Sequence, residues 1–304
     1  MNTSKFSLSV GVIGLGAMGN GMAQSVRRAG YSPYVFDVRA EVAQAFSKDG
    51  GTACTSLAEL GKNSDVVVSV VVNATQTESV LFGSSGADGC ATSMKQGSVF
   101  VMCSTVDPNW SVDLEARLAA LGILYIDAPI SGGAAKAASG QMTMMTAGKP
   151  EAYAIAEPIL NAMAAKVYKL GNSAGAGSKV KIINQLLAGV HIAAAAEAMA
   201  LGLREGVNPE ALYEVITHSA GNSWMFENRM AHVLAADYTP LSAVDIFVKD
   251  LGLVLDMARA SKFPLPLSST AHQMFMQAST AGFANEDDSA VIKIFPGIEL
   301  PKKK

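Results

Sequence analysis

The sequence has 304 residues, of which 50% are hydrophobic, so it can bury a large core and suggests one or two domains. Its formal net charge of -3 provides no basic surface for nucleic acid. The run of like charge at residues 302–304 is typical of a solvated chain end rather than of a binding site.

The cysteines and histidines indicate neither disulfides nor a metal. Three cysteines lie far apart without a Cys-x-x-Cys pair, a pattern typical of a reduced, cytoplasmic protein. Four histidines lack the His-Glu-x-x-His spacing of a zinc enzyme, so we expect no metal. The apolar run nearest to eighteen residues, 186–203, is interrupted by His191 and Glu197, so we expect no membrane span.

A strand, a glycine turn and a helix open the chain. Residues 8–13 predict a buried strand, and residues 18–29 predict a helix. A second strand over residues 34–37 ends in Asp37, 21 residues after Gly16, where an acidic residue binds ribose hydroxyls of a dinucleotide. The predicted cofactor-binding residues of the turn are Gly14, Leu15, Gly16, Ala17, Met18 and Gly19.

Each glycine of this turn has a physical role. Gly14 permits the tight turn, Gly16 lets the backbone approach a pyrophosphate, and Gly19 lets the helix pack on the strand. Alone, the motif also describes a simple glycine-rich turn, and its context favours the dinucleotide site. Asp37 would repel a 2′-phosphate, which favours NAD over NADP, although Arg39 could weaken that preference.

Further apolar runs predict strands over residues 65–72, 98–102, 123–127, 142–146 and 166–170. Because helical stretches separate most of them, we expect a mainly parallel sheet covered on both faces. Ligands gather beyond the carboxyl ends of such strands, which draws attention to residues 72–73, 104–105 and 127–133. The predicted fold is α/β, with a doubly wound Rossmann-type domain over residues 1–172 and an all-helical substrate and oligomerisation domain over residues 173–304.

A long helix is predicted over residues 175–204, because no proline interrupts the segment and alanine, leucine and methionine fill it. On this helix Lys181 shares one face with Asn184 and Gln185, while Lys179 points the opposite way. Periodicity alone also allows Lys181 to extend from a core helix to the surface.

Four motifs in one order give a family resemblance. They are Gly-x-Gly-x-Met-Gly at 14–19, Asp-Ala-Pro-Ile-Ser-Gly-Gly at 127–133, Gly-x-Gly-x-x-x-Lys-x-x-Asn-Gln at 175–185 and Lys-Asp-Leu-Gly-Leu at 249–253. Over essentially its whole length the chain resembles the β-hydroxyacid dehydrogenases, the group of 3-hydroxyisobutyrate dehydrogenase and tartronate semialdehyde reductase. The resemblance implies that Lys181 is catalytic and that Val72, Asn73, Thr105 and Lys249 contact NAD. Relatives commonly have Leu-Pro where this chain has Val71-Val72.

The resemblance implies a mechanism. A hydride leaves the carbinol carbon of a hydroxy acid for NAD while Lys181 takes the hydroxyl proton. A free lysine has a pKa near ~10.4, which desolvation and the positive nicotinamide would have to lower. Ser131 and the amides of Gly132 and Gly133 would bind the substrate carboxylate, and Asn184 would anchor other substrate oxygens. Without the resemblance, residues 131–133 are equally well a simple turn.

Residues 219–228 add a polar cluster to the helical half. Asn222 and Ser223 are candidates for recognising substrate hydroxyls, whereas Trp224 is interpreted as core packing. Residues 71–77, 131–140 and 219–229 resemble a branch of the family that acts on a four-carbon sugar acid. A non-enzymatic reader of the cofactor or an imine reductase of the same architecture would be expected to lack Lys181. Alanine-rich helices and the resemblance suggest a homodimer or homotetramer.

Overall fold

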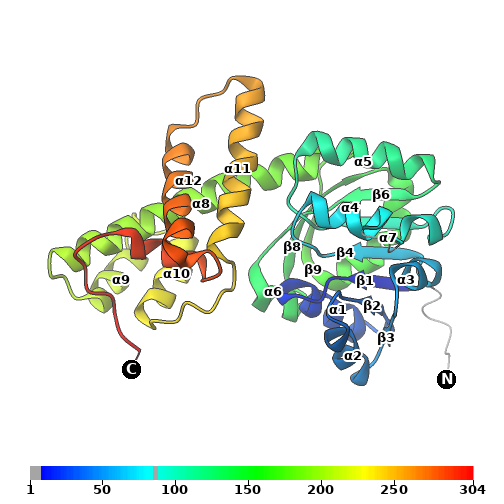
Figure 1. The fold of residues 1–304 in the computed structure, drawn as a ribbon, viewed down its shortest axis with the longest axis horizontal. Coiled ribbons are helices and arrows are strands. Elements are labelled where there is room, and N and C mark those ends of the chain that lie inside the picture. The colour runs from blue at the N-terminus through cyan, green and yellow to red at the C-terminus, as the bar shows by residue number, and fades with distance from the viewer. Residues whose placement is uncertain (1–7, 85–87, 304) are drawn as a thin grey trace. The chain divides into compact units, whose positions relative to one another are not determined.

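The computed structural model describes residues 8–84 and 88–303, and the chain forms two compact units, residues 1–181 and 182–304. The first unit is a sheet covered by helices, and the second is helical (Figure 1). This confirms the predicted fold class. The units divide inside helix α8 (Ala176–Arg204), so the domain boundary expected after residue 172 stays a prediction.

The described strands of the first unit are β1 (Val10–Ile13), β2 (Tyr34–Phe36), β3 (Thr52–Ala53), β4 (Val66–Ser69), β5 (Val99–Met102), β6 (Leu124–Asp127), β7 (Ile130–Ser131), β8 (Met142–Gly148) and β9 (Ala164–Lys169). They form one sheet in the order β3-β2-β1-β4-β5-β6-β8-β7, with β9 paired to β8. Strands β1 to β6 are parallel, and β8 runs antiparallel to β6 and β7. The strand order reverses direction at β1, which places a ligand crevice beyond its carboxyl end.

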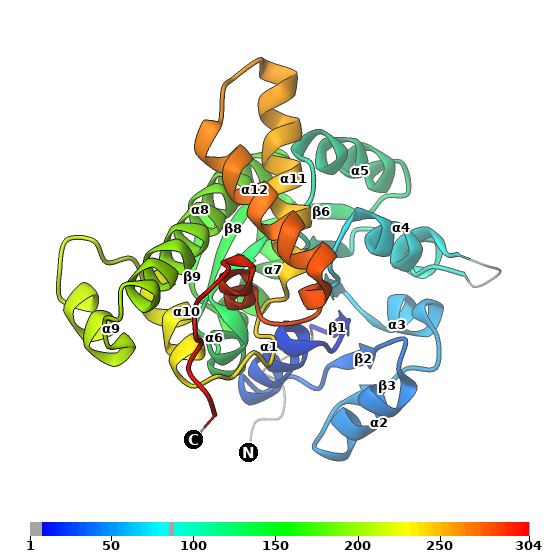
Figure 2. The same ribbon diagram turned by 60° about the vertical axis from the view of Figure 1, so that its left-hand side comes forward.

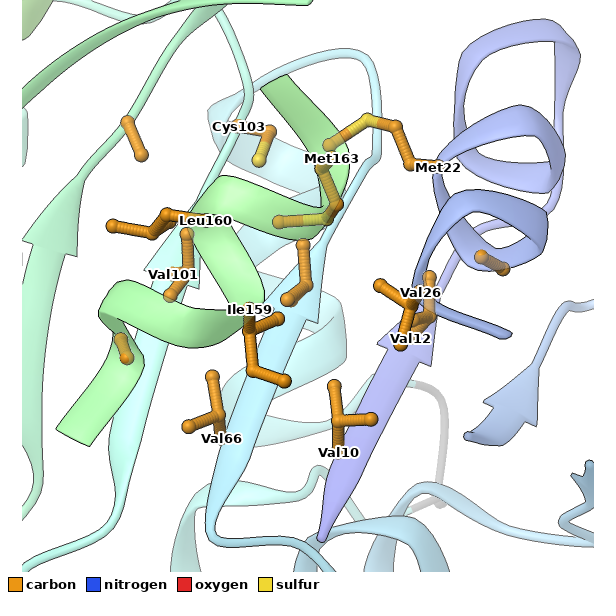
Figure 3. Close-up of a cluster of buried hydrophobic side chains, with 14 of the residues drawn as sticks. Val10, Val12, Met22, Val26, Val66, Val101, Cys103, Ile159, Leu160 and Met163 are labelled. Atoms are coloured by element: carbon orange, nitrogen blue, oxygen red, sulfur yellow. The ribbon is translucent and has the colours of Figure 1, made fainter. Parts of the chain in front are cut away.

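Helices cover both faces of the sheet: α1 (Ala17–Arg28), α2 (Ala40–Lys48), α3 (Leu57–Asn63), α4 (Ala74–Phe82), α5 (Pro108–Ala120), α6 (Gly133–Ser139) and α7 (Pro150–Met163), with a 3-10 turn at Ala91–Ser93. Alternate strand residues face opposite sides, as period-2 geometry requires. Val10 and Val12 pack with Met22 of α1 and with Ile159 and Leu160 of α7 (Figure 3). On the opposite face, Val67 and Phe100 pack with residues of α3, α4 and α5.

Several predicted element boundaries need correction. The strand expected over residues 65–72 ends at Ser69, because Val72 donates its amide to Gln76 Oε1, 2.8 Å away, in the cap of α4. Strands β3 and β7 were not predicted, since two residues each are too short for a periodic signal. Residues 295–303 are not helical, in contrast to the expectation of helices to the end, and this segment contains Pro296 and Pro301.

The second unit consists of the remainder of α8 with α9 (Pro209–Thr217), α10 (Trp224–Leu234), α11 (Val244–Ser261) and α12 (Pro266–Ala278), followed by a π turn at Ser279–Phe283 and a 3-10 helix at Asp288–Ile294. Helices α11 and α12 lie side by side in both views (Figures 1 and 2). Their Phe247 and Phe275 rings stack with centroids 5.1 Å apart. Ile182, Ile192 and Met199 of α8 belong to the same core.

Helix α8 is long and apolar enough, by length and composition, to cross a membrane, and half of its most apolar window is buried. The core helix of a soluble protein passes the same test, so this property is weak evidence for a membrane span. Its 29 residues correspond to about 44 Å at ~1.5 Å per residue, and its bounds agree with the helix predicted over residues 175–204.

Candidate active site

The glycine turn follows β1 at the point where the sheet order reverses. Gly14 has a φ of +86°, and a side chain there would come within 2.6 Å of the Val70 carbonyl oxygen. A side chain at Gly19 would come within 1.8 Å of the Gly14 carbonyl oxygen, so this glycine allows α1 to pack on the turn. Gly16 precedes α1 without a side-chain cap and has open space around it. An anion can therefore approach the free amides at the start of α1.

Asp37 is held beside this turn by hydrogen bonds. Its carboxylate accepts from the Leu15 amide at 2.7 Å, the Arg39 amide at 3.0 Å and Arg39 Nε at 3.1 Å. Burial raises the pKa of Asp37, but the bonds from Arg39 and Leu15 outweigh this effect and hold the pKa below its ordinary value. The carboxylate is therefore ionised at neutral pH and fixed next to the turn. Arg39, which sequence analysis treated as a competitor of Asp37, is its ion-pair partner.

A cleft of about 580 Å³ opens at the same place. It is lined by Leu15, Gly16, Ala17, Asn20, Gly21, Gln24, Arg28, Arg39, Val42, Ala134 and Ala138. The two arginines and the helix start make this cleft suitable for the phosphates of a dinucleotide. Asn20, Gln24 and Arg28 were missed from the sequence, although their spacing places them on one face of α1.

Val72 and Asn73, predicted to contact the cofactor, cap helix α4. Asn73 Oδ1 accepts from the Gln76 amide at 2.8 Å, and Gln76 Oε1 accepts in return from the Val72 amide. This reciprocal arrangement fixes the loop after β4. Thr105, the third predicted contact, is half-buried in the loop after β5. The structure places all three beyond the carboxyl ends of parallel strands, and their contact with NAD stays a prediction.

The predicted carboxylate site, Ser131 to Gly133, lies where β7 ends and α6 begins. Gly132 and Gly133 have φ values of +140° and +78°, which other residues rarely adopt, and nothing lies within 4 Å of a side chain added at Gly133. Helix α6 packs on α1, where Ser25 Oγ donates to the Ala137 carbonyl at 3.0 Å. The structure thus brings residues 131–133 and the glycine turn onto neighbouring helices.

Lys181 is buried on α8, with 7% of its surface exposed, whereas Lys179 is exposed. Gln185, on the same face as Lys181, is also buried, and Asn184 is half-buried. The predicted face is confirmed, and the alternative of a lysine reaching the surface is wrong. One turn before Lys181, the amide and hydroxyl of Ser178 donate to the Asp127 carboxylate, an interaction that sequence analysis missed.

A second group of polar side chains lies within the helical unit. Gln185 Nε2 donates to Asp250 Oδ2 at 2.6 Å, and the Lys249 ammonium lies 2.7 Å from Asp250 Oδ1. Asn184 Nδ2 donates to Gln185 Oε1 at 3.1 Å. The buried Asp250 thus orients two residues predicted to meet ligands, Lys249 and, through Gln185, Asn184. Asp250 was not predicted as a functional residue, although it follows Lys249 in the motif.

The predicted hydroxyl-binding residues lie at the start of α10. Ser223 is its N-cap and accepts from the Phe226 amide at 3.0 Å. Asn222 donates to the Thr217 carbonyl at 3.1 Å and to Glu227 Oε1 at 2.9 Å, while its Oδ1 is buried without a partner among the described residues. Their substrate role stays a prediction. The interpretation of Trp224 as core packing is wrong, because 53% of it is exposed in the first turn of α10.

In the part of the chain that the structure describes, no three His, Cys, Asp or Glu side chains are grouped so that they could hold a metal ion. The three cysteines are buried free thiols. Burial raises the pKa of Cys54 to about 11 and that of Cys90 and Cys103 to about 12, so none is poised as a nucleophile.

The open glycine turn with Asp37 beside it defines the first unit as the dinucleotide-binding domain of an oxidoreductase. Residues 9–171 match the family described as the NAD binding domain of 6-phosphogluconate dehydrogenase. Residues 175–295 match the family described as NAD-binding of NADP-dependent 3-hydroxyisobutyrate dehydrogenase. The chain belongs to the 3-hydroxyisobutyrate dehydrogenase-like family of NAD-dependent hydroxyacid dehydrogenases.

Individual members of this family match the chain over nearly their full length. The chain is 68% identical to L-threonate dehydrogenase of Cupriavidus necator, over 98% of this chain and 99% of that protein. It is 50% identical to L-threonate dehydrogenase of Escherichia coli K12, over 97% of both chains. A crystal structure described as 3-hydroxyisobutyrate dehydrogenase from Salmonella typhimurium is 52% identical, with a TM-score of 0.90, covering 95% of this chain and 100% of that one.

Proposed function

We propose that this protein oxidises L-threonate at C2 to 2-oxo-tetronate with NAD, and that Lys181 is its general acid and base. The main support for L-threonate as the substrate is the 68% identity to an L-threonate dehydrogenase over nearly the whole of both chains. Mouse mitochondrial 3-hydroxyisobutyrate dehydrogenase is 33% identical over 93% of this chain, so the general substrate of the family is less favoured.

The first unit fits NAD. Asp37 offers a fixed carboxylate for ribose hydroxyls, Gly16 leaves room for the pyrophosphate, and the start of α1 offers free amides. When bound, NAD accepts the hydride from the substrate carbon. The residues of this chain bind and orient both molecules and transfer the proton.

Lys181 handles that proton in the proposed mechanism. The buried Lys181 would take the C2 hydroxyl proton as the hydride leaves, at a position shielded from bulk water. In the reverse direction the resulting ammonium returns the proton to the oxygen. Asn184, three residues along α8 and oriented by Gln185, would hold a substrate oxygen next to the lysine.

The substrate carboxylate is assigned to Ser131 and to the backbone amides of Gly132 and Gly133. The open space at Gly133 allows a carboxylate to approach the start of α6 closely. The terminal hydroxyls are assigned to Asn222 and Ser223. The buried, unpartnered Oδ1 of Asn222 supports this, because such an acceptor costs about 1–3 kcal/mol unless a donor satisfies it.

The test is kcat/KM for L-threonate, D-threonate and 3-hydroxyisobutyrate with NAD, and for tartronate semialdehyde with NADH, followed by NADH absorbance. We expect L-threonate to exceed 3-hydroxyisobutyrate by about 100-fold or more, because polar groups built for hydroxyls are left unpaired by a methyl group. A clear preference for 3-hydroxyisobutyrate, the activity in the description of the Salmonella structure, would overturn the substrate assignment.

We also infer that the protein is a cytoplasmic homo-oligomer, a homodimer or homotetramer. Val180, Ile183, Leu187 and Leu201 of α8 are exposed, and helical spacing places them on one face. An apolar stripe of this kind is typical of a surface covered by a second copy. Light scattering of the purified protein measures its mass, and a monomeric mass would contradict the assembly.

A further inference from the structure

The first turn of α8 is attached to the end of β6 by a single carboxylate. Asp127 Oδ2 accepts from the amides of Gly175 and Ser178, both at 2.9 Å. Its Oδ1 accepts from Ser178 Oγ at 2.7 Å. The donors lie 48 and 51 residues further along the chain than Asp127. Asp127 therefore caps α8 from a neighbouring strand, as an N-cap residue normally does from within its own helix.

The glycines of the Gly-x-Gly motif before Lys181 make this attachment possible. Gly175 has a φ of +94°, which turns its amide toward the carboxylate. A side chain at Gly177 would lie 2.4 Å from the Met145 carbonyl oxygen and 2.9 Å from that of Asp127. The first turn of α8 thus rests directly on the end of β6 and the middle of β8, and no side chain fits between them at Gly177.

Asp127 is fully buried, and none of the ion pairs formed by the described residues involves it. Burial raises the pKa of this carboxyl, and the bonds from Ser178 and Gly175, together with one from the Ser111 side chain, counteract the rise. The partial positive charge of the α8 N-terminus also favours an anion at this position. A buried charge whose hydrogen-bond donors lie mainly on one helix end is costly to disturb, so it holds that helix end in place.

We propose that Asp127 is a positioning residue, which fixes the first turn of α8 on the sheet and thereby sets the place of Lys181 relative to the cofactor-binding turns. Lys181 follows Ser178 by three residues, so it lies within about 60° of Ser178 around the helix. A displacement of about 1 Å at a reacting group can cost about 100-fold in rate. The inference rests on the proposed role of Lys181 in proton transfer.

The chain contains a matched control in its other unit. Asp287, also fully buried, accepts from Ser289 Oγ at 2.7 Å, from the Ser289 amide at 3.1 Å and from the Leu241 amide at 3.0 Å. Its hydrogen-bond donors are nearly those of Asp127, and His232 Nδ1 also lies 3.8 Å from its Oδ1. Asp287 caps a 3-10 helix outside the proposed catalytic and binding residues. If Asp127 only stabilised the fold, the two aspartates would give the same phenotype.

The experiment compares Asp127→Asn and Ser178→Ala with Asp287→Asn and Ser289→Ala in the full chain. The measurements are kcat, KM for NAD, and the isotope effect on kcat with substrate deuterated at the reacting carbon. We expect kcat to fall about 100-fold in Asp127→Asn and about tenfold in Ser178→Ala, with KM for NAD changed less than about threefold. The isotope effect should rise in both, because hydride transfer becomes slower than product release. Both controls should keep the parent values.

Hydrogen exchange over residues 179–184 tests the attachment without any substrate. Asp127→Asn should speed exchange there by about tenfold or more, and Asp287→Asn should not. Unchanged exchange would show that Asp127 does not hold the first turn of α8 in place.

Faster exchange with a kcat within threefold of the parent, or an equal loss of kcat in the controls, would overturn the positioning role of Asp127. If Asp127→Asn fails to fold, the milder Ser178→Ala decides by the same criteria. A parent protein inactive on L-threonate but active on another hydroxy acid would refute only the substrate, and the comparison then uses that acid.

Discussion

Asp127 in the first unit and Asp287 in the second are buried aspartates with almost the same hydrogen-bond donors. They connect different structural elements. Asp127 accepts from two backbone amides and from Ser178 Oγ, and Asp287 accepts from two backbone amides and from Ser289 Oγ, with both hydroxyl bonds at 2.7 Å. The donors of Asp127 are at least 48 residues away, whereas two of the three donors of Asp287 are two residues away. The same local chemistry thus ties a helix to a sheet in one unit and closes a short helix in the other.

The charged groups around each aspartate indicate whether it affects catalysis or stability. Asp287 precedes Asp288, whose carboxylate is bridged by Arg229 through both Nε and Nη2. That unit compensates its buried charge with an opposite charge. Asp127 relies on a helix N-terminus instead, and this helix carries the buried Lys181. We therefore expect disturbance of Asp127 to change the rate, and disturbance of the Asp287–Asp288 cluster to change stability.

The largest effect on rate is expected from Lys181→Ala. The loss of kcat in this variant is the upper limit for the loss that a change at Asp127 can cause. Removing the proposed acid and base should lower kcat by about 10³-fold or more, while NAD binding persists because the glycine turn is untouched. Steady-state kinetics and fluorescence titration of the cofactor measure the two quantities. Activity within tenfold of the parent would refute the catalytic assignment, and the role of Asp127 with it.

On the stability side, Arg229→Met should have the largest effect. It leaves the fully buried Asp288 without its cation, and breaking one partner of a buried pair costs about 3–5 kcal/mol. Urea unfolding measures the loss, and kcat well below the unfolding temperature should stay at the parent value. A fall in kcat as large as that of Asp127→Asn would remove the functional distinction between the two clusters.

The pH dependence of stability sharpens the comparison further. Burial raises the pKa of Asp288 to about 7, although the attraction of Arg229 opposes the rise. Between the ordinary value of about 4 and that value, the folded chain keeps a proton that the unfolded chain has released. This contribution to the free energy of unfolding is present at low pH and is lost as pH rises through the window. The parent's stability relative to Asp288→Asn should therefore fall from pH 4 to 7, and a rising difference would contradict this.

The smallest effect is expected at a third buried aspartate, Asp37, whose partner Arg39 is exposed. Asp37→Ser removes the acceptor for ribose hydroxyls and the charge that repels a 2′-phosphate, and it releases Arg39. The preference for NAD over NADP, as a ratio of kcat/KM values, should shrink by about tenfold. The Lys181 step should be little affected. Equal use of both cofactors by the parent would show that Arg39, rather than Asp37, decides the preference.

Local sequence signals determined the parallel strands, the glycine turn and the buried face of α8. The apolar runs and the glycine turn predicted the parallel strands around β1, because backbone geometry and strand periodicity act over a few residues. Helical spacing alone placed Lys181 with Gln185 and away from Lys179, and the burial of α8 agrees. The signal failed for short elements such as β3 and β7, and for Trp224, whose size suggested burial that the fold does not provide.

Tertiary structure alone decided which partner each polar side chain meets. Asp127 and Ser178 are 51 residues apart, Arg229 and Asp288 are 59 apart, and Gln185 and Asp250 are 65 apart. Periodicity indicates which face of a helix or strand is buried, but it carries no information on the element packed against that face. Asp127 and Asp287 illustrate this limit. Each is an aspartate at the edge of a regular element, and only the packing that brings α8 onto β6 places one of them on Ser178, one turn before Lys181.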